Sequence, residues 1–572
     1  MFSPEAIVEA NAIDEKIKQV LCNGENFRVD AGAGSGKTFS LMKVIEWLQD
    51  NKANEYRRTG KKVACLTFTN AAVDVILSRL DENSFIQPMT IHSFAWSVIK
   101  QFQNKILELM DNENLLPEDV KMEEIIDIQY SLGIKYFNTD EHTLYLGHND
   151  ILKLFASFLN NQKFRNVLSN IYPIVLIDEY QDSNKNVVDK FIEYYISQNK
   201  GIQFGFFGDS WQTIYQTNGA CGFVDHQNIT SIKKTINFRS SQVIVDVLNK
   251  IRPDMPQKSA LTEQMGSVKI ITCDDFSGTR RNDRAFTGDL PVSELEKRLD
   301  TLKSFYIERQ AETESLKVLM LTHRLLAEQQ GYYNLFTLLD DGLKNADDAL
   351  LSFFINTIAP LIEAINSNDI LAICDVLGVK RFPIKKKKDK RRWSSLKNLF
   401  IGINDKSIFE ILSIFKKSEV LPFPTEISAI YEKMQENSKE NYQKGTYSEL
   451  KNITYKEFQN AKNFLRPDSL YSTEHGVKGE EYDSVIFVVS KGWYLYQFDK
   501  YMPLQSNPLD DKERKSYERN RNLFYVCCSR ARRNLVLFVT FKLESPFKEY
   551  LEYLVGQENI VSYDEFVRTQ VV

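Results

Sequence analysis

The sequence predicts an α/β protein with two parallel sheets flanked by helices and two mostly helical insertions. Three observations lead to this prediction. Short apolar runs alternate with helical segments, a glycine-rich loop joins one run to a helix, and two long stretches carry few strand signals. At about 150 residues per domain, the 572 residues correspond to roughly four domains.

The first predicted sheet collects short apolar runs of β type, each followed by polar or helix-starting residues. These runs are 26–30, 62–67, 173–177, 203–207 and 232–236. A second set of runs, separated by long helical segments, predicts a second sheet. Its members are 268–272, 318–321, 485–489 and 535–539. The polar segment 276–291 is expected to be a surface loop, followed by a helix that Ser293 and Glu296 cap.

This alternation predicts two sheet domains, two insertions and a tail. The first sheet domain would comprise 1–99 and 171–240, with 100–170 inserted between them. The second would comprise 241–322 and 468–545, with 323–467 inserted, and 546–572 would form a C-terminal tail.

Composition places the chain among ordinary globular proteins, with 43% apolar, 26% charged and 12% aromatic residues. The net charge of -5 gives no overall positive field, so a nucleic-acid site must rest on local geometry. The seven cysteines are scattered without metal-ligand spacing, which favours a reducing, cytoplasmic location. The acidic start of the chain is unlike a secretory leader. The apolar stretch 349–365 is interrupted by polar residues, so we expect a buried helix and no membrane span.

A phosphate-binding loop is predicted at AGAGSGKT, which follows a predicted strand and opens a predicted helix. Small residues let the backbone N–H groups surround a β-phosphate, and the helix N-terminus adds a favourable dipole. Lys37 would neutralise β- and γ-phosphate oxygens, and Thr38 would bind Mg²⁺. The alternative is a glycine turn without a ligand, since alanine stands where the pattern has its first glycine. The residues expected to contact the nucleotide are Ala31, Gly32, Ala33, Gly34, Ser35, Gly36, Lys37 and Thr38.

The apolar run in IVLIDEYQD delivers a carboxylate pair, Asp178 and Glu179, to the sheet edge where the phosphate loop is expected. Asp178 suits Mg²⁺ coordination, and Glu179 suits positioning or deprotonating an attacking water. Such a pair is also common at an exposed strand end. The neighbouring phosphate loop favours the catalytic interpretation.

With these residues in place, the sequence resembles the superfamily 1A DNA helicases of the UvrD, PcrA and Rep type. Seven short strings resemble motifs Ia, Ib, II, III, IV, V and VI of that family and occur in the family's order. They are TFTNAA (67–72), TIHSF (90–94), IDEYQDSN (177–184), GDSWQTIY (208–215), NFRSS (237–241), TEHGVKGEEYDSVIF (473–487) and YVCCSRA (525–531). The resemblance implies two RecA-like P-loop domains that bind ATP and Mg²⁺ at their interface.

The resemblance also assigns roles at that interface. Gln212, Arg239 and Arg530 would act on the γ-phosphate, because a planar guanidinium spreads charge over the transferring oxygens. Phe238 would stack on adenine and Glu481 would bind the ribose. The cofactor-binding set also includes Gly479, and the catalytic set also includes Lys37, Asp178 and Glu179.

For DNA, the resemblance implies a single strand that crosses both sheet domains. Phe68 and Tyr215 would provide stacking faces, each worth about 1 to 3 kcal/mol per base. The expected polar contacts are Thr69, Asn70, His92, Ser93, Thr473 and His475. Outside this motif context, a lone phenylalanine or histidine is more often a packing residue.

The sequence departs from the family pattern at three places. One is motif VI, where ERNRN (518–522) stands in place of the family's acidic residue and paired arginines. Glu15 and Lys16 stand where the family has the glutamine that reads adenine. After Tyr215 the chain lacks the family's aromatic residue and arginine. Elsewhere, the basic run 385–392 is open to two interpretations, a contact with a duplex backbone and a solvated loop.

The resemblance predicts an ATP-dependent translocase and helicase that moves 3′ to 5′ on single-stranded DNA. The alternative is a DNA-sensing regulatory ATPase that controls a partner nuclease with little unwinding of its own. The chain's size and the CSRA form of motif VI are similar to the helicase-like subunit of Gabija-type anti-phage systems, which accompanies an OLD-like endonuclease. Expected partners are therefore single-stranded or tailed double-stranded DNA and such a nuclease.

Overall fold

The computed structural model divides the chain into two compact units. Unit 1 comprises Met1–Leu319 and Glu474–Val572, and unit 2 comprises Met320–Thr473. The structure describes all residues except 1, 82–83, 113–114, 118–119, 132–134, 214–218, 264–265, 284–285, 310–314, 321–322, 340–347, 379–393, 395–397, 399, 401, 419–422, 444, 466–468, 474–478, 492–494 and 571–572.

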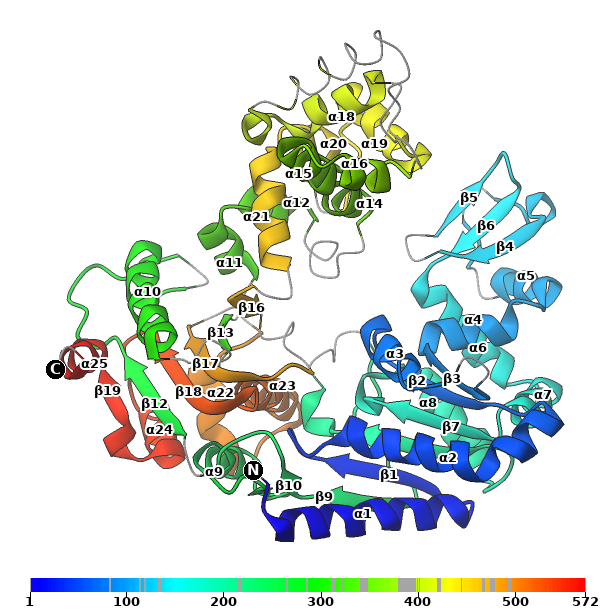
Figure 1. The fold of residues 1–572 in the computed structure, drawn as a ribbon, viewed down its shortest axis with the longest axis horizontal. Helices are drawn as coiled ribbons and strands as arrows, with labels where there is room; N and C mark the ends of the chain where they lie inside the picture. Colours follow the sequence, from blue (N-terminus) through cyan, green and yellow to red (C-terminus); the bar gives the residue numbers. More distant parts are fainter. Residues whose placement is uncertain are drawn as a thin grey trace. The chain divides into compact units, whose positions relative to one another are not determined.

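Unit 1 contains the first predicted sheet, which is wholly parallel (Figure 1). Its strand order is β3-β2-β7-β8-β1-β9. The strands are β1 (Asn26–Ala31), β2 (Val63–Thr67), β3 (Ile86–Thr90), β7 (Ile174–Asp178), β8 (Gln203–Gly208) and β9 (Ile229–Lys234). Because parallel strands end at the same edge, the loops after β1, β2, β3, β7 and β8 are brought to one side of the sheet.

Helices cover both faces of this sheet, as a buried parallel sheet requires. Strand β7 shows the alternation: Ile174 and Leu176 join the core under α1 and α2, and Val175 and Ile177 join the opposite core. The first face carries α1 (Pro4–Cys22) and α2 (Lys37–Thr59). The second carries α4 (Ile91–Ile99), α6 (His148–Leu159), α7 (Gln162–Ile171), α8 (Lys185–Phe191) and the π-helical turn η3 (Ile192–Ile196).

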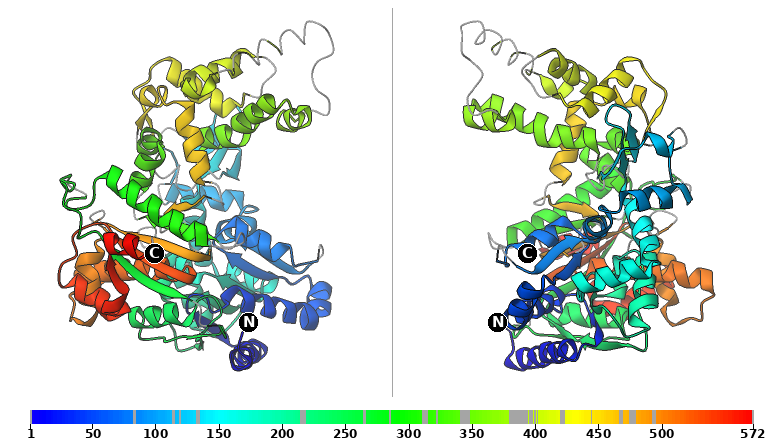
Figure 2. Two further views of the ribbon diagram at one scale, coloured as in Figure 1. Left: turned by 60° about the vertical axis from the view of Figure 1, so that its left-hand side comes forward. Right: turned by 90° about the vertical axis from the view of Figure 1, so that its right-hand side faces the viewer.

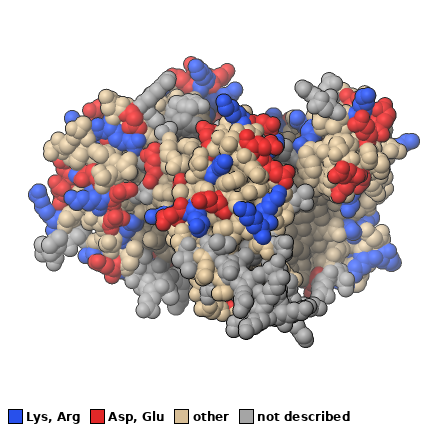
Figure 3. All heavy atoms as spheres, turned by 90° about the horizontal axis from the view of Figure 1, so that it is seen from above, with Lys and Arg blue, Asp and Glu red and all other residues tan. Residues whose placement is uncertain are grey.

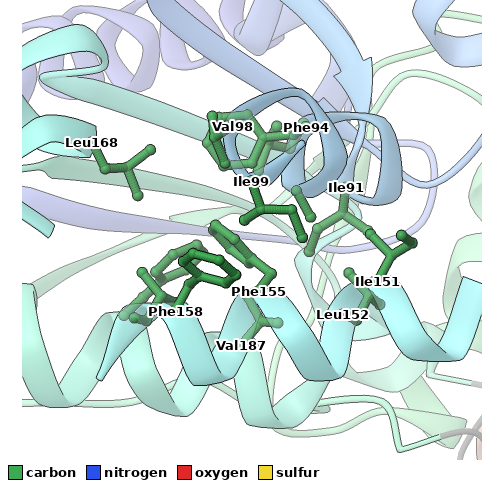
Figure 4. Packing of buried hydrophobic residues seen from close by; sticks show 14 of the residues in the cluster. Ile91, Phe94, Val98, Ile99, Ile151, Leu152, Phe155, Phe158, Leu168 and Val187 are labelled. Carbon is green, nitrogen blue, oxygen red and sulfur yellow. The ribbon is translucent and has the colours of Figure 1, made fainter. Parts of the chain in front are cut away.

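The core of the second face is apolar and tightly packed (Figure 4). Phe94 and Ile99 of α4 meet Phe155 and Phe158 of α6, with Val187 of α8 beside them. Phe94 and Phe155 pack edge to face, with ring centroids 5.8 Å apart. This core fixes α4, and therefore the residues at its N-terminal end, on the sheet.

The first insertion is helical at its ends and carries a small sheet that the sequence analysis did not predict. The sheet order is β4-β6-β5. Its strands are β4 (Asp127–Tyr130), β5 (Tyr136–Asn138) and β6 (Thr143–Leu146), and they follow α5 (Gln103–Asn112) and η1 (Met122–Glu124). The strands were missed because each has only three or four residues, too few to show a β-type period.

Unit 1 also contains the second predicted sheet. Its strand order within this unit is β13-β17-β18-β12-β19. Strands β17, β18, β12 and β19 pair in parallel. The strands are β12 (Ser267–Thr272), β13 (Leu316–Met320), β17 (Tyr482–Val489), β18 (Ala531–Val539) and β19 (Ile560–Ser562). The helices are α9 (Gln242–Ile251), α10 (Val292–Arg309), α22 (Phe498–Tyr501), η8 (Met502–Ser506), α23 (Asp511–Cys528), α24 (Phe547–Val555), η9 (Gln557–Asn559) and α25 (Tyr563–Gln570). The two parallel sheets flanked by helices that the sequence predicts are thus confirmed.

Details of this domain differ from the expectation. The segment 546–572, which was expected to form a tail, contains strand β19, and β19 pairs with β12 at the edge of the second sheet. This end of the chain is drawn in red beside the green strand β12 in Figure 1 and Figure 2. The helix expected to start at Ser293 begins at Val292. The expected surface loop before it is anchored by Asp289, whose carboxylate accepts hydrogen bonds from the Thr540 hydroxyl and the Lys491 N–H.

Unit 2 is largely helical, as expected for the second insertion. Its helices are α11 (His323–Gln330), α12 (Tyr333–Leu339), α14 (Ala349–Phe353), η6 (Phe354–Ile358), α15 (Ala359–Ser367), α16 (Ile370–Val376), η7 (Ile403–Asp405), α18 (Ile408–Lys417), α19 (Thr425–Gln435), α20 (Tyr447–Leu450) and α21 (Tyr455–Leu465). Its short strands are β14 (Asn441–Tyr442), β15 (Gly445–Thr446) and β16 (Tyr471–Thr473). The helical stretch Ala349–Ser367 is long and apolar enough to pass as a membrane span, but 56% of its most apolar window is buried inside the protein.

Charged side chains of both signs are mixed over the surface seen in Figure 3. This mixture agrees with the small net charge of -5. The basic run 385–392 lies outside the described residues.

Candidate active site

The phosphate loop lies between β1 and α2 and is shaped by glycines. Gly34 and Gly36 have φ angles of +72° and +76°, in the left-handed region that favours glycine. A Cβ atom on Gly34 would come within 2.7 Å of the Asn237 side-chain oxygen. The Ser35 hydroxyl donates to the Gly32 carbonyl at 2.7 Å and closes the loop. The backbone is therefore packed too closely for larger residues at Gly34.

Lys37 lies at the first turn of α2, facing the carboxylates that follow β7. Its Nζ is 3.3 Å from Glu179 Oε1. Glu179 has a φ of +49°, an uncommon conformation for a residue other than glycine, and strain of this kind gathers at functional sites. Asp178 is buried at the end of β7 and accepts a hydrogen bond from the Glu179 N–H at 3.0 Å. The structure thus brings the predicted lysine and carboxylates together.

Gln212 lies on the short turn η4 (Ser210–Gln212) that follows β8. Its amide donates to Asp209 Oδ2 at 3.0 Å. The N–H of Asp209 donates to the Gln181 side chain at 3.1 Å, and Gln181 donates in turn to Glu179 at 2.5 Å. Gln212 is therefore connected to Glu179 through two buried side chains.

The segment after β9 contacts the phosphate loop. It contains the short strand β10 (Ile236–Asn237), which pairs with β11 (Lys258–Ser259). The Asn237 amide donates to the Ala33 carbonyl at 2.9 Å, and the Phe238 N–H donates to the Gly34 carbonyl at 2.8 Å. The predicted adenine-stacking ring is therefore fixed beside the loop. The ring of Phe2 packs edge to face against it, with centroids 5.1 Å apart.

Arg239 links this segment to the second sheet. Its Nε donates to Glu481 Oε2 at 2.7 Å and its Nη1 donates to the Ser529 carbonyl at 3.0 Å. Burial opposes ionisation of Glu481, but hydrogen bonds from Arg532 and Arg239 prevail and lower the pKa of its carboxyl group. Gly479, two residues before Glu481, has a φ of +88°.

Arg530 is the largest fully buried side chain, with 1% of its surface exposed. Its guanidinium donates to the carbonyls of Val526 and Glu480 at 3.0 and 3.1 Å. Burial and the charge of Arg239 lower the pKa of Arg530 to about 9, whereas the charge of Glu179 acts in the opposite direction. The charge of Glu179 therefore acts on Arg530, which stays protonated at neutral pH.

These residues fit a nucleotide with Mg²⁺. Lys37 and the loop N–H groups suit phosphate. Thr38 offers a hydroxyl oxygen and Asp178 a carboxylate oxygen. Mg²⁺ commonly binds one or two protein groups of this kind, together with phosphate oxygens and water. Within the described ranges, no group of three or more His, Cys, Asp or Glu residues could hold a metal by itself.

Five of the eight predicted nucleic-acid residues follow the ends of β2 and β3, which pair at Thr67 and Thr90. Phe68 is 45% exposed, and the next two residues, Thr69 and Asn70, are also exposed. The Thr69 hydroxyl caps α3 (Asn70–Leu77) by accepting from the Ala72 N–H at 3.2 Å. Ser93 is exposed at the first turn of α4.

His92 lies in a different environment from its neighbours. Its ring packs edge to face against His148, with centroids 4.5 Å apart. Burial, followed by the charge of His148, lowers the pKa of His92 to about 4, so the ring is neutral at neutral pH. Tyr215 and His475 lie outside the described residues, as does the side chain of Thr473.

Sequence reasoning missed three residues that touch the phosphate loop or its neighbours. The Tyr525 hydroxyl accepts a hydrogen bond from the Ala33 N–H at 3.1 Å. Gln257 donates to the Ala33 carbonyl at 3.2 Å, and Arg252 donates to Asp209 at 2.7 Å. Tyr525 opens the string YVCCSRA, but 492 positions separate it from Ala33, so only the fold could reveal the contact.

Helix α1 is held against α2 by a buried carboxylate. Asp14 is buried beside α2, where it accepts a hydrogen bond from Lys43 at 2.8 Å and lies 3.4 Å from Lys234 Nζ. The Ser40 hydroxyl donates to it as well, at 2.5 Å. Asp14 therefore ties α1 to the helix that carries Lys37.

Comparisons with known proteins bear on this arrangement. A model described as an AAA domain matches residues 14–218, which cover five of the six strands of the first sheet and the first insertion, but not β9. The chain is 26% identical to the Gabija protein GajB of Bacillus cereus (strain VD045), with 95% of this chain and 99% of that protein covered. It is 21% identical to GajB of Bacillus cereus (strain HuB5-5), with 92% and 95% covered. It is also 25% identical to the ATP-dependent DNA helicase Rep of Buchnera aphidicola subsp. Schizaphis graminum, with 39% of this chain and 41% of Rep covered.

Proposed function

Because this chain is an ATP-hydrolysing relative of the UvrD- and Rep-like helicases, we propose that its turnover drives movement along single-stranded DNA. The observation that carries the proposal is the ring of charged and polar groups around the phosphate loop. Lys37 and Glu179 follow strands of the first sheet, and Arg530 directly precedes strand β18 of the second sheet. A site built from both sheets makes turnover depend on their relative position.

The residues divide the chemistry among themselves. The loop N–H groups and Lys37 bind the β- and γ-phosphates, and Lys37 then exchanges its ion pair with Glu179 for the phosphates. Glu179, released from that pair, accepts the proton of the attacking water. Arg239 and Arg530 stabilise charge on the transferring phosphoryl oxygens. A bound Mg²⁺, held by Thr38 and Asp178, would supply further charge neutralisation.

The exposed residues at the ends of β2 and β3 suit a strand that must slide. Phe68 offers a stacking face to any base, and Thr69, Asn70 and Ser93 offer polar groups nearby. We propose Tyr215, Thr473 and His475 as further contacts on the strength of the motifs, with 3′-to-5′ movement as in the helicases that the motifs resemble.

The extent of the match to GajB favours a second function. The match to GajB covers nearly all of this chain and of GajB, whereas the match to Rep covers less than half of this chain and of Rep. In this version the chain is an ATPase of an anti-phage defence system that senses DNA and controls a partner nuclease. The OLD-like character of that partner follows from the motif resemblance alone.

The two versions are separated by measuring ATP turnover with and without single-stranded DNA, and then unwinding of 3′-tailed and 5′-tailed duplexes. A helicase predicts DNA-stimulated turnover with separation of the 3′-tailed duplex. A sensor predicts stimulated turnover without strand separation. Turnover that DNA does not change would contradict both versions.

A further inference from the structure

A cavity of about 470 Å³ lies in unit 1 between helix α4, helix α5 and strand β4. Figure 1 shows these three elements beside one another. Trp96 and Lys100 line the cavity from the C-terminal end of α4, Gln103 from α5, and Gln129 and Tyr130 from β4. Its volume falls in the range of about 300 to 1,000 Å³ that is usual for small-molecule sites. None of its lining residues belongs to the phosphate loop or to the predicted DNA contacts.

The cavity is held together by hydrogen bonds from one side chain, that of Gln103. Its amide nitrogen donates to the carbonyls of Lys100 at 2.7 Å and of Ile128 at 3.2 Å. Its amide oxygen accepts from the Ile128 N–H at 3.0 Å. Ile128 also lines the cavity and is only 2% exposed, so strand β4 is fixed against the two helices from within. A ligand therefore meets a preformed site, which lowers the entropic cost of binding.

Two aromatic rings line the cavity. The ring centroids of Trp96 and Tyr130 are 6.4 Å apart, and the ring planes are inclined by 52°. The Tyr130 hydroxyl bonds to Nδ1 of His148 at 2.5 Å, which fixes the tyrosine ring. Trp96 packs against the buried core of the second face of the sheet and remains partly exposed. A planar ligand can therefore lie on the face of one ring with its edge toward the other.

Several polar groups of the cavity are available to a ligand. Among the described residues, the indole N–H of Trp96, the side-chain amide of Gln101 and the ammonium of Lys100 have no hydrogen-bond or ion-pair partner. The Gln129 amide nitrogen donates to Asp127 Oδ2 at 2.9 Å, and the amide oxygen remains an acceptor. Lys100, Gln101 and Gln129 are exposed. Glutamine amides beside an aromatic face suit adenine, because one amide can donate to and accept from the edge of that base.

The charges around the cavity favour a ligand with one anionic group. Lys100 is the one cation among the described residues that line it. Asp127 lies next to it through Gln129, and Glu123 and Glu124 of η1 come shortly before β4 in the chain. A nucleic-acid strand with successive phosphates needs several cations, whereas a single lysine ammonium can pair with a single phosphate.

We propose that this cavity binds the 5′-monophosphate of an adenine nucleoside. The base lies against Trp96, the side chains of Gln101 and Gln129 bond to its edge, and Lys100 pairs with the phosphate. The inference goes beyond the proposed function, because it places a second nucleotide site outside the phosphate loop and requires neither hydrolysis nor DNA.

The test is a calorimetric titration of the full chain with AMP while a non-hydrolysable ATP analogue saturates the phosphate loop. We expect AMP to bind with a Kd below about 1 mM. Adenosine, which lacks the phosphate, is expected to bind more weakly than AMP. A fluorescent form of the analogue reports in parallel whether AMP displaces it from the loop, and we expect no displacement.

Three variants locate the site. Trp96→Leu keeps an apolar side chain on the core but removes the stacking face, so AMP should bind about fivefold to 150-fold more weakly. Lys100→Gln should weaken the binding of AMP and leave that of adenosine unchanged, so the preference for AMP should be lost. Gln101→Ala removes an exposed amide and leaves the core intact, and AMP should bind about threefold to tenfold more weakly.

Matched controls lie close to the cavity. Phe102→Leu removes a ring that packs against the same core as Trp96, with its centroid 5.7 Å from that of Phe158, but Phe102 is not a lining residue. Lys105→Gln removes a lysine of α5 that pairs with Glu108 at 2.6 Å. Both variants should keep the wild-type affinity for AMP, and thermal unfolding midpoints check that all five variants are folded.

Each outcome bears on the proposal. A wild-type chain that does not bind AMP, or that binds it only by displacing the analogue from the phosphate loop, would overturn it. Wild-type AMP affinity in both Lys100→Gln and Gln101→Ala would also overturn it, as would equal losses in Trp96→Leu and Phe102→Leu. A single-stranded oligonucleotide that competes with AMP and binds more tightly would replace the proposal with a nucleic-acid site. Failure of the ATP analogue to bind would instead contradict the proposed function.

Discussion

Two regions on the same edge of the first sheet differ in how their side chains are held. Around the phosphate loop, Lys37, Glu179 and Gln212 are bonded to one another or through buried neighbours. At the ends of β2 and β3, Phe68 and Asn70 project from the surface. Fixed groups suit a reaction that needs exact placement of charge, and exposed rings suit a ligand that must pass along the surface. In the proposed function, one edge of the sheet therefore holds the hydrolytic groups and the DNA-contacting groups at separate places.

The largest effect is expected in the fixed region, from Glu179→Gln. The amide cannot accept the proton of the attacking water, so turnover should fall by about 10² to 10⁴. Nucleotide binding should persist, because Lys37 and the loop N–H groups remain. Steady-state ATP turnover, paired with binding of a fluorescent ATP analogue, measures both properties.

Glu193→Gln is the matched control for that experiment. Glu193 forms an exposed ion pair with Lys190 and lies far along the chain from the phosphate loop. ATP turnover by the Glu193→Gln variant should equal that of the wild type. If Glu179→Gln also kept wild-type turnover, Glu179 would have no place in the reaction.

A smaller effect is expected in the exposed region, from Phe68→Ala. The loss of one stacking face should weaken binding of single-stranded DNA by about 1 to 3 kcal/mol. Nucleotide affinity without DNA should not change, since Phe68 follows β2 and is not part of the phosphate loop, which follows β1. Fluorescence anisotropy with a labelled oligonucleotide measures the loss.

Val75→Ala offers a comparison on the same exposed surface, because Val75 is a 48% exposed apolar residue of α3. Equal losses from Phe68→Ala and Val75→Ala would argue that the region responds to any apolar truncation and that Phe68 is not a stacking face.

The last effect is on the stability of the fold and concerns His92. Its folded pKa of about 4 is below the ordinary value of 6.5, so the folded state favours the neutral ring. The resulting stability is present above pH 6.5 and is lost as the pH falls toward 4. After allowance for the partial exposure of His92, the stability lost between pH 6.5 and pH 4 amounts to about 2 kcal/mol.

Thermal unfolding midpoints of the wild type and His92→Gln, compared at pH 7.5 and at pH 4.5, test this expectation. The wild type should lose more stability on acidification than the variant. Equal losses would mean that His92 titrates normally, and it would then be available as a cation for phosphate.

The comparison also shows what the sequence could predict. Strands such as β7 and β17 were predicted because buried parallel strands are continuous apolar runs. Strand β3 was missed because IQPMT contains proline and polar residues and reads as a turn. The edge strand β19 was missed for a related reason, since its three residues carry little signal.

Within the site, the predicted residues share one property: they belong to short strings that join a strand to a loop. Tyr525, Arg252 and Gln257 were missed because their roles depend on helices that approach the loop only after folding. No local pattern marks a tyrosine that bonds to a backbone group 492 positions away.

The central claim is that both sheets contribute to one hydrolytic site, and Arg530→Lys tests it most directly. Lysine keeps the charge but cannot reproduce the planar guanidinium, so turnover should fall by about 10³ or more while analogue binding changes only a few-fold. Arg533→Lys, an exposed neighbour, should retain wild-type turnover, and thermal midpoints confirm that both variants are folded. Turnover by a folded Arg530→Lys variant close to that of the wild type would contradict the account.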